Sequence, residues 1–512
     1  MTAGALLQLK YGLDDRMAFL TFNPSISHFK SVYKRYTNFS METISVLPNR
    51  NNILSFDTDT SISFKIGRDG DLIKDMFLTF EFPDIYSSSN TTDSMTQGCG
   101  GNHSFQWIKR LAEYLVKEIT ITMDTQTMID HHYSEWFHIH SEMTLPFEKK
   151  NGYYDMIGNI TEYYDPANSA GCNGNYPSGY TNGNPSTPYA PSIVGRRIIL
   201  PLQFWFNQNA VNSFPLIATQ HMEFWVNVTL RKLKELYTII NSNDDRIQPP
   251  SNLVFGKFHY PQTNTNILDL NVNLEVNYIF LEREERKRFA LASHEYLITQ
   301  LQRITYSSSS NNISTINIDM RNFSKPVTNL FFIIRRTDFE SCNQWSNFTN
   351  WISDIPPYRS GFINPFGSNP TLSQFPAKIE YYKTPYMLRG SRILINGSDL
   401  VNGRIYNFDN GGTDINGKDS FYYNYIQPYM FQKNIPSQGI YSYSFSLDNN
   451  EFQPNGAINM SSISTKELIL SLINMDQIGY NEQSYNINVY VFALNYEITR
   501  ILGGMFGTAS SN

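Results

Sequence analysis

Cysteines and long apolar runs are scarce in this chain of 512 residues. The three cysteines, Cys99, Cys172 and Cys342, lie far apart and form no Cys-x-x-Cys pair, which argues against a disulfide framework and against a zinc site. No stretch reaches about 18 consecutive apolar residues, the length that a membrane-spanning helix needs. The beginning, MTAGALLQLKYGLDD, has no basic leader before its short apolar run. We therefore expect a soluble protein that is made in the cytosol.

Charged side chains are also few, at 17% of the residues, and the net charge is -6. A phosphate backbone would repel the protein as a whole, so any contact with nucleic acid would need a local basic patch. The chain is instead rich in aromatic residues, with 33 Tyr and 35 Phe, and has 24 Pro and 29 Gly for turns. This composition favours strands around sizeable cores, and the length predicts two large β domains or three smaller ones.

Bases and aromatics alternate in SHFKSVYKRYTNFSMETI, Ser27 to Ile44, the combination that grips single-stranded nucleic acid elsewhere. The apolar residues at positions 26, 29, 32, 33 and 36 nevertheless recur at helical spacing, and Ser25 can cap a helix there. The pattern predicts a short amphipathic helix whose aromatic stripe packs on a core. Lys30 and Lys34 would lie together on a separate, solvated face.

Strand patterns dominate the rest of the chain. Apolar residues alternate with polar ones at 62–66, 76–82, 119–123, 316–320, 441–447, 468–472 and 487–491, and buried strands are predicted at 196–206, 221–230, 273–281 and 327–336. Gly67 to Asp71, GRDGD, has the residues of a hairpin turn. Irregular, turn-rich stretches at 168–192, 342–376 and 401–436 are predicted to be loops. The pattern predicts an all-β fold with two antiparallel sandwiches in tandem.

The most charged run, EREERKRFALASHEYLITQLQ, covers Glu282 to Gln302 near the middle of the chain. Pairs four residues apart, Glu282 with Arg286 and Glu284 with Arg288, predict an exposed helical segment and a domain boundary. The predicted division is an N-terminal arm (1–24), a first sandwich (25–288), a linker (289–302), a second sandwich (303–502) and a C-terminal tail (503–512).

Candidate chemistry is confined to DHHYSEWFHIH, where Asp130, His131, His132, His138 and His140 lie close in sequence. The stretch from Tyr133 reads as a helix, on which His138 and His140 point apart, so hydrogen-bonded or surface histidines are the favoured interpretation over a metal site. No Gly-x-Ser-x-Gly motif or placed carboxylate pair suggests hydrolysis. The sequence predicts no enzyme and no cofactor.

Several blocks resemble one family. FNPSISHFKSVYKRYTNFSMETI, GRDGDLIKDMFLTFEFP, LPLQFWFNQNAVNSFPLIATQHMEFWVNV, VNYIFLEREERKRFALASHEYLITQLQ, YSFSLDNNEFQPNGAINMSSI and NVYVFALNYEITRILGGMFGTAS are similar, in this order, to blocks of the double jelly-roll major capsid proteins of large eukaryotic (nucleocytoplasmic) DNA viruses. The structural motif residues are Asn23, Pro24, Gln453, Pro454 and Gly456. Asn455 stands where the family usually has a serine.

The resemblance implies two tandem eight-stranded antiparallel jelly-roll sandwiches with short helices and long loops. It further implies a homotrimer that forms a pseudo-hexagonal capsomer of an icosahedral shell, assembled in the host cytoplasm. Expected partners are the chain itself, neighbouring capsomers, minor or cement capsid proteins and an internal viral membrane, with no specific nucleic acid. A minor capsid paralogue of the same fold stays open, as does a glycan-binding β-sandwich protein.

Two groups of residues are expected to make contacts. The predicted N-terminal helix would meet its neighbours through Phe29, Lys30, Tyr33, Lys34, Arg35 and Tyr36. The junction between the sandwiches would use Glu282, Arg286, Arg288, His294 and Tyr296.

Overall fold

Antiparallel strands make up most of the computed structural model of this chain. The structure describes residues 2–11, 22–49, 52–87, 104–124, 127–172, 176–177, 191–240, 246–251, 253–259, 263–308, 314–350, 386–401, 418–449, 451, 453–472 and 485–508. Cys99 and parts of the three predicted loops (173–175, 178–190, 351–376 and 402–417) lie outside these residues. In the described part of the third predicted loop, residues 422–431 are helical rather than irregular.

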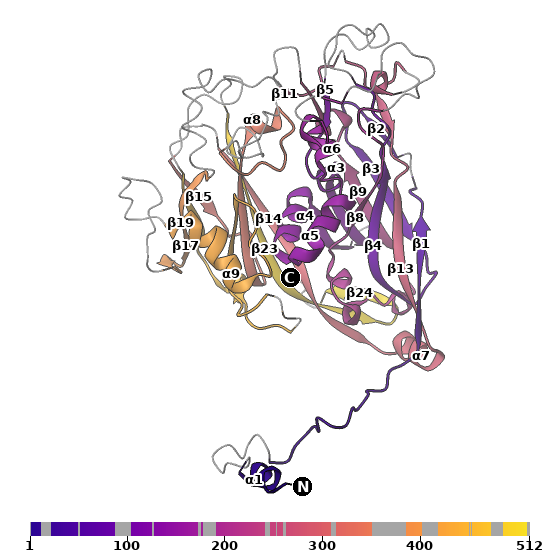
Figure 1. The fold of residues 1–512 in the computed structure, drawn as a ribbon, viewed down its shortest axis with the longest axis vertical. Coiled ribbons are helices and arrows are strands. Elements are labelled where there is room, and N and C mark those ends of the chain that lie inside the picture. The colour runs from indigo at the N-terminus through magenta and orange to yellow at the C-terminus, as the bar shows by residue number, and fades with distance from the viewer. Residues whose placement is uncertain are drawn as a thin grey trace.

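The first sandwich consists of two facing sheets (Figure 1). One sheet has the order β1 (Phe39–Val46), β13 (Asn273–Leu281), β4 (Leu72–Glu81), β8 (Arg197–Pro201), and the other has the order β3 (Thr60–Ile66), β9 (Phe224–Leu230), β6 (Val116–Met123), β7 (Thr127–Tyr133). Short strands extend it: β5 (Ser104–Trp107) with β10 (Tyr237–Ile240) and β11 (Arg246–Ile247), and β2 (Ile53–Ser55) with β12 (Ile267–Asp269). Its helices are α3 (Leu111–Leu115), α4 (Ser134–Thr144), α5 (Phe147–Met156) and α6 (Thr161–Tyr164).

The second sandwich has the same plan. One sheet has the order β14 (His294–Ser307), β23 (Ile487–Leu502), β16 (Pro326–Arg336), β20 (Ile440–Ser444), with β21 (Ile458–Asn459) on β16 and β24 (Met505–Thr508) on β23. The other has the order β15 (Thr315–Asp319), β22 (Lys466–Leu472), β17 (Leu388–Ile395), β18 (Ser398–Asp399), with β19 (Lys418–Asp419) on β17. The helices here are α7 (Arg283–Leu291), α8 (Thr337–Glu340) and α9 (Gln427–Phe431).

Both sandwiches pair their strands in the same nested order. In chain order, the first principal strand pairs with the eighth, the second with the seventh, the third with the sixth and the fourth with the fifth. The eighth strand also pairs with the third, and the seventh with the fourth, which rolls this long hairpin into two facing sheets. This is the jelly-roll topology. The predicted all-β fold of two jelly rolls in tandem is therefore confirmed.

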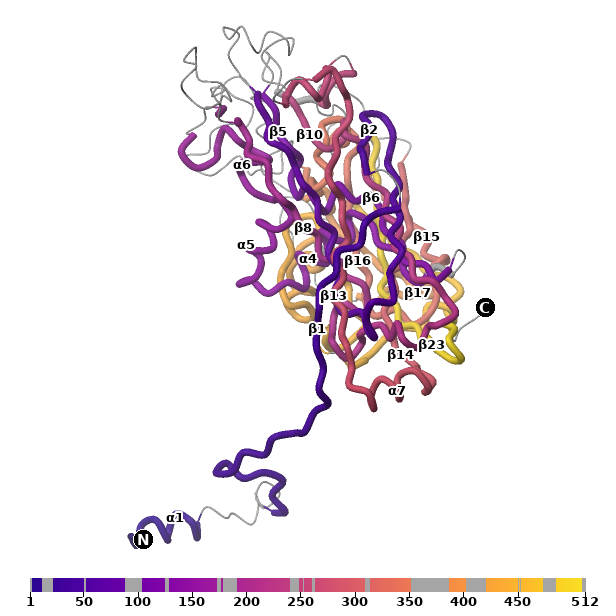
Figure 2. The backbone as a smooth tube through the Cα atoms, turned by 90° about the vertical axis from the view of Figure 1, so that its right-hand side faces the viewer, coloured from indigo at the N-terminus to yellow at the C-terminus, as the bar shows by residue number. Residues whose placement is uncertain are grey.

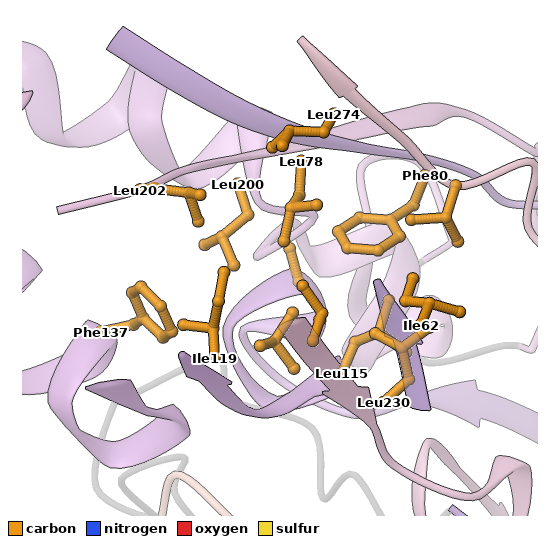
Figure 3. Packing of buried hydrophobic residues seen from close by; sticks show 14 of the residues in the cluster. Ile62, Leu78, Phe80, Leu115, Ile119, Phe137, Leu200, Leu202, Leu230 and Leu274 are labelled. Carbon is orange, nitrogen blue, oxygen red and sulfur yellow. The ribbon is translucent and has the colours of Figure 1, made fainter. Parts of the chain in front are cut away.

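The two inner faces of each sandwich supply its core. Along β3, Ile62, Phe64 and Ile66 are buried while the residues between them face outward, as the alternation predicted. They belong to the same core cluster as Leu78 and Phe80 of β4 and Leu230 of β9, and Figure 3 shows Ile62 among these side chains. Each such buried side chain stabilises the fold by about 1.5–3 kcal/mol. A separate cluster built on β15, β16, β17, β22 and β23 fills the second sandwich.

Four further predictions about local structure are wrong. Residues 67–71 form no hairpin, because β3 pairs with β9 in one sheet and β4 with β13 and β8 in the other. Residues 294–302 of the predicted linker belong to β14, which finds a partner in β23 along its whole length. Residues 505–508 of the predicted tail form β24, and its Phe506 is buried in the first core.

The fourth concerns the N-terminal segment. Residues 25–36 form no helix, and every residue from 22 to 43 is exposed. The helix lies earlier, at α1 (Ala3–Tyr11). The segment that precedes β1 leaves the body of the molecule at the end that carries α7 and extends away from it (Figure 2). A helix this short needs a packed apolar face, and the described body of the chain offers none here.

Candidate functional site: the joint between the sandwiches and the N-terminal arm

Helix α4 joins the two sandwiches. It follows β7 of the first sandwich directly, and Phe137 points into that core. Trp136, Ile139 and Met143, three or four residues apart, form the opposite stripe. This stripe packs on the outer face of the second sandwich in a cluster completed by Leu301, Phe331, Ile333, Phe348, Ile440 and Phe492. Helix α4 thus lies between the sandwiches (Figure 1) and is buried on two sides.

A buried ion cluster lies beside this stripe. Arg335 of β16 is only 3% exposed and contacts Glu135 of α4 through Nη1 at 3.1 Å. Its Nη2 donates to the Tyr490 hydroxyl at 2.7 Å and lies 3.0 Å from Oε1 of Glu340. Burial opposes ionisation of Glu135, but Arg335 and other nearby arginines hold its pKa below the usual range. The carboxylate is therefore charged and tied to the second sandwich.

A second polar cluster supports α4 from the first sandwich. Arg110 contacts Glu113 at 2.9 Å and also Glu142 of α4. Lys150 of α5 contacts the other oxygen of Glu142 at 2.7 Å. Burial raises the pKa of Glu142, but these two bases outweigh it and bring the pKa to about 2. The same carboxylate accepts a hydrogen bond from the Ser437 backbone N–H at 3.3 Å, so it reaches the second sandwich as well.

The segment after β16 makes a further set of contacts between the two sandwiches. Buried Asn343, with φ 56°, donates through Nδ2 to the carbonyl oxygens of Lys234 and Tyr237, both at 2.7 Å. Trp345 donates through Nε1 to the Glu235 carbonyl at 3.0 Å and belongs to the first core. The Arg231 guanidinium lies 4.2 Å from the centre of the Trp345 ring, within cation–π range. Residues of the second sandwich thus complete the packing of the first.

The candidate histidines each have a hydrogen-bonding or ionic partner, as the favoured interpretation predicted. His131 lies 3.1 Å from Glu118, and His132 lies 3.1 Å from Asp130. On α4, Nδ1 of His138 lies 2.9 Å from the Tyr114 hydroxyl, and Nδ1 of His140 lies 3.2 Å from the Thr144 hydroxyl. In the described ranges, no group of three or more His, Cys, Asp or Glu side chains could hold a metal ion.

The predicted junction residues lie in and next to α7 and at the start of β14. Glu282 precedes α7, the helix that the charged run predicted, and Arg286 pairs with Asp71 at 2.9 Å rather than with Glu282. Asp71 also accepts the Leu281 backbone N–H at 2.9 Å, which anchors the start of α7 to the 67–71 turn.

The other junction residues lie at or beyond the end of α7. In its last turn, the backbone carbonyl of Arg288 accepts a hydrogen bond from the backbone N–H of Ala292 at 2.9 Å. The His294 ring stacks on Phe289 at 5.1 Å, and the Tyr296 ring lies 5.7 Å from that of Trp205.

The residues of the predicted N-terminal helix are not brought to this joint. Phe29, Lys30, Tyr33, Lys34, Arg35 and Tyr36 all lie in the exposed segment between α1 and β1. Asn23, with φ 51°, and Pro24 are exposed there as well.

The second motif block lies between β20 and β21. Gln453 and Pro454 are exposed, and Asn455 donates to the Asp448 carbonyl. Gly456 has φ 143°, and a Cβ there would come within 3.1 Å of the Phe445 carbonyl oxygen. The glycine therefore permits a close backbone crossing.

Sequence reasoning missed the joint itself. The predicted helix from Tyr133 was correct, but its two apolar stripes were not recognised as contacts to two different cores. One signal was available: Arg335 and Arg336 continue the buried run VTNLFFII, and a charged residue inside a buried strand needs a partner. The partner, Glu135, is 200 residues away in sequence, and no local pattern connects the two.

Two jelly rolls in tandem, locked by a shared helix and buried ion pairs, define a double jelly-roll protein. Comparison with known families then narrows the class. Residues 27–282 match the model described as the major capsid protein N-terminus, and residues 285–507 match that of the large eukaryotic DNA virus major capsid protein. The chain belongs to the major capsid proteins of large eukaryotic DNA viruses, and its role is structural, in the virion capsid.

Individual relatives agree over the full length. The chain is 29% identical to the major capsid protein of Phaeocystis pouchetii virus, with 100% of both chains covered. It is 28% identical to that of Paramecium bursaria Chlorella virus 1, again with 100% of both covered. Among solved structures, a chain of the PBCV-1 virus capsid superposes with a TM-score of 0.64 at 24% identity, covering 95% of this chain and 100% of that one. The Faustovirus major capsid protein gives 0.59 at 13% identity, covering 97% and 96%.

Proposed function

We propose that three copies of this chain form a pseudo-hexagonal capsomer and that these capsomers tile an icosahedral shell. The observation that carries the proposal is the repeated strand order within one rigidly joined chain. Two similar blocks held at a fixed orientation let a three-fold ring present six similar outer faces, which suits hexagonal packing.

The joint gives this proposal its mechanical basis. A shell needs blocks that keep their shape under load, and the buried α4 stripe and ion pairs resist rotation of one sandwich against the other. Permanent interfaces of such assemblies bury roughly 2,000–5,000 Å². The partners we propose are the other two copies, neighbouring capsomers, minor or cement proteins and an internal viral membrane, with assembly in the host cytoplasm and no specific nucleic acid. In the described part of the chain, no helix has the length and apolarity to cross a bilayer.

Native mass spectrometry of the purified full chain tests the capsomer directly. We expect a stable trimer of 59.1 kDa subunits that shows six lobes in negative-stain images. A monodisperse monomer that binds an oligosaccharide would favour the glycan-binding alternative and overturn the proposal. Copy number in purified virions separates the main shell protein from a minor paralogue, since the main one must dominate the protein mass.

A further inference from the structure

The N-terminal segment carries an unusual share of exposed apolar side chains. Of the 28 large hydrophobic residues that are exposed in the described chain, 13 lie between positions 6 and 47. Phe29 is 100% exposed and Tyr33 is 88% exposed. Soluble proteins rarely leave such a dense apolar segment in water unless a partner covers it. From here on, residues 22–41 are called the arm, in place of the segment 1–24 that the sequence predicted as an arm.

The arm combines a helical pattern with the beginning of a turn. The Ser27 hydroxyl accepts the Phe29 backbone N–H at 3.3 Å, and the Ser27 carbonyl accepts that of Lys30 at 3.4 Å. A serine bonded in this way is a typical N-cap. From there Phe29, Val32, Tyr33 and Tyr36 would share one face of a helix. About ten residues cannot hold a helix in water alone, so the pattern needs a surface to pack on.

Charge favours a partner made of the same chain. Residues 1–41 carry five Lys or Arg and two Asp or Glu, a net charge of +3. Since the whole chain has a net charge of -6, residues 42–512 have a net charge of -9. Residues 22–41 hold three of these bases and no acid. The body of another copy would therefore attract the arm over the Debye length of about 8 Å at physiological salt.

An apolar strip lies at the end of the molecule from which the arm departs (Figures 1 and 2). Leu297 of β14 and Ile498 of β23 face each other directly, as do Leu502 of β23 and Met505 of β24. Because side chains alternate along a strand, all four point to one side, with exposed fractions of 41–62%. We call these four residues the basal strip. The Glu295–Arg500 ion pair lies on the same face.

The opposite face of the same strands is occupied. Ile298, Ile501 and Phe506 are buried in the first core. The basal strip therefore points away from the body of its own chain, where a neighbour could reach it.

We propose that Ser27–Tyr36 folds into a helix whose aromatic face packs on the basal strip of a second copy in the same trimer. The inference rests on the proposed trimer and adds what the arm does within it. Docking buries the aromatic side chains of the arm against the four apolar side chains of the basal strip. Each subunit is then held to the next by a segment that lies outside the two sandwiches.

Site-specific photo-crosslinking of the full-length trimer tests the contact. Tyr33 is replaced by p-benzoylphenylalanine, and isotopically heavy and light chains are mixed before assembly. We expect crosslinked dimers whose heavy–light peptides join residue 33 to residues within 291–299 or 498–505. Crosslinks confined to one chain, or to another surface, would overturn the inference. A species with the trimer mass but without arm crosslinks would do so too, while leaving the proposed capsomer intact.

Substitutions at Lys34 separate the helix from the charge. Lys34→Ala and Lys34→Pro both remove the same charge, but only proline disrupts a helix interior. We expect Lys34→Ala to keep the crosslink yield within about twofold and Lys34→Pro to lower it at least tenfold. A trimer that forms with Lys34→Ala but not with Lys34→Pro would support the inference equally. Equal yields from both variants would contradict it.

Two further measurements address the strip and the other candidate partners. Ile498→Asp, at an exposed position, should abolish the crosslink while the circular dichroism of the fold stays unchanged.

Vesicles of phosphatidylcholine with 30% phosphatidylserine serve as the lipid probe, and a 20-nucleotide single-stranded DNA serves as the nucleic-acid probe. Arm-dependent binding of the intact trimer to either one, without arm crosslinks between subunits, would replace a second copy by that partner.

Discussion

Replacing one partner of the buried pair Glu135–Arg335 should lower the free energy of unfolding more than replacing both partners. Arg335→Met takes away the guanidinium but keeps most of its bulk, and it leaves a carboxylate that is 5% exposed. Arg303, at 3.9 Å, and Arg231 remain as cations near it, but neither makes a close ion pair with it. An uncompensated buried charge of this kind costs about 3–5 kcal/mol. We expect a similar cost for Glu135→Gln, because Arg335 then keeps only Glu340 as a charged partner.

The double variant is the decisive one. If the pair acts as a unit, the variant with both Arg335→Met and Glu135→Gln should unfold with a cost no larger than either single change, giving a coupling energy of at least about 3 kcal/mol. Urea unfolding at one fixed protein concentration, followed by tryptophan fluorescence, measures all four chains.

The exposed pair Glu295–Arg500, with both side chains 57% exposed, serves as the control and should change stability by less than about 1 kcal/mol. Costs for the buried pair that simply add would refute the view that it locks the joint.

Three further predictions concern the pH dependence of stability and two glycines. Burial and nearby Arg110 hold the pKa of His138 well below its usual value, so the folded chain stays neutral there while the unfolded chain takes up a proton below about pH 6.5. Stability should therefore fall by about 2 kcal/mol from this group between pH 7.5 and 5.0, and His138→Gln should remove that part of the pH dependence. Gly439 has φ 92°, and a Cβ there would overlap the Phe348 carbonyl, so Gly439→Ala should cost at least about 2 kcal/mol. Gly152 in α5 has nothing within 4 Å of a new Cβ, so Gly152→Ala should raise the melting temperature through a gain of about 0.5–1 kcal/mol.

The alternation of apolar and polar residues predicted the strands well where one face of the strand is buried and the other is more exposed. The residues at 62–66 and 468–472 follow a strict inside–outside pattern, and the structure places them in β3 and β22. The pattern failed at boundaries that depend on a partner. Alternation from Tyr441 continues to Leu447, yet β20 ends at Ser444, because its pairing with β16 ends at Asn329. Strand length is thus set by the neighbouring strand as much as by the strand itself.

The pairing of strands was beyond local patterns for a related reason. Gly67 to Asp71 has the composition of a hairpin turn, but the partners of the flanking strands come from more than about 110 residues later in the chain. The joint has the same character, since Glu135 and Arg335 meet only once both sandwiches are folded. Resemblance to a family conveyed the fold class because it carries long-range information that spacing lacks.

The arm shows the same dependence on a partner, one level higher. Its helical pattern is unmistakable in sequence, yet residues 25–36 form no helix in the single chain. Helix α4, of similar length, is helical because two cores cover its faces. Since short helices gain most of their stability from packing, the contrast between these two segments lies in their surroundings and not in their propensities. The helical pattern of the arm, which the single chain does not form, therefore predicts a packing surface on another copy in the trimer.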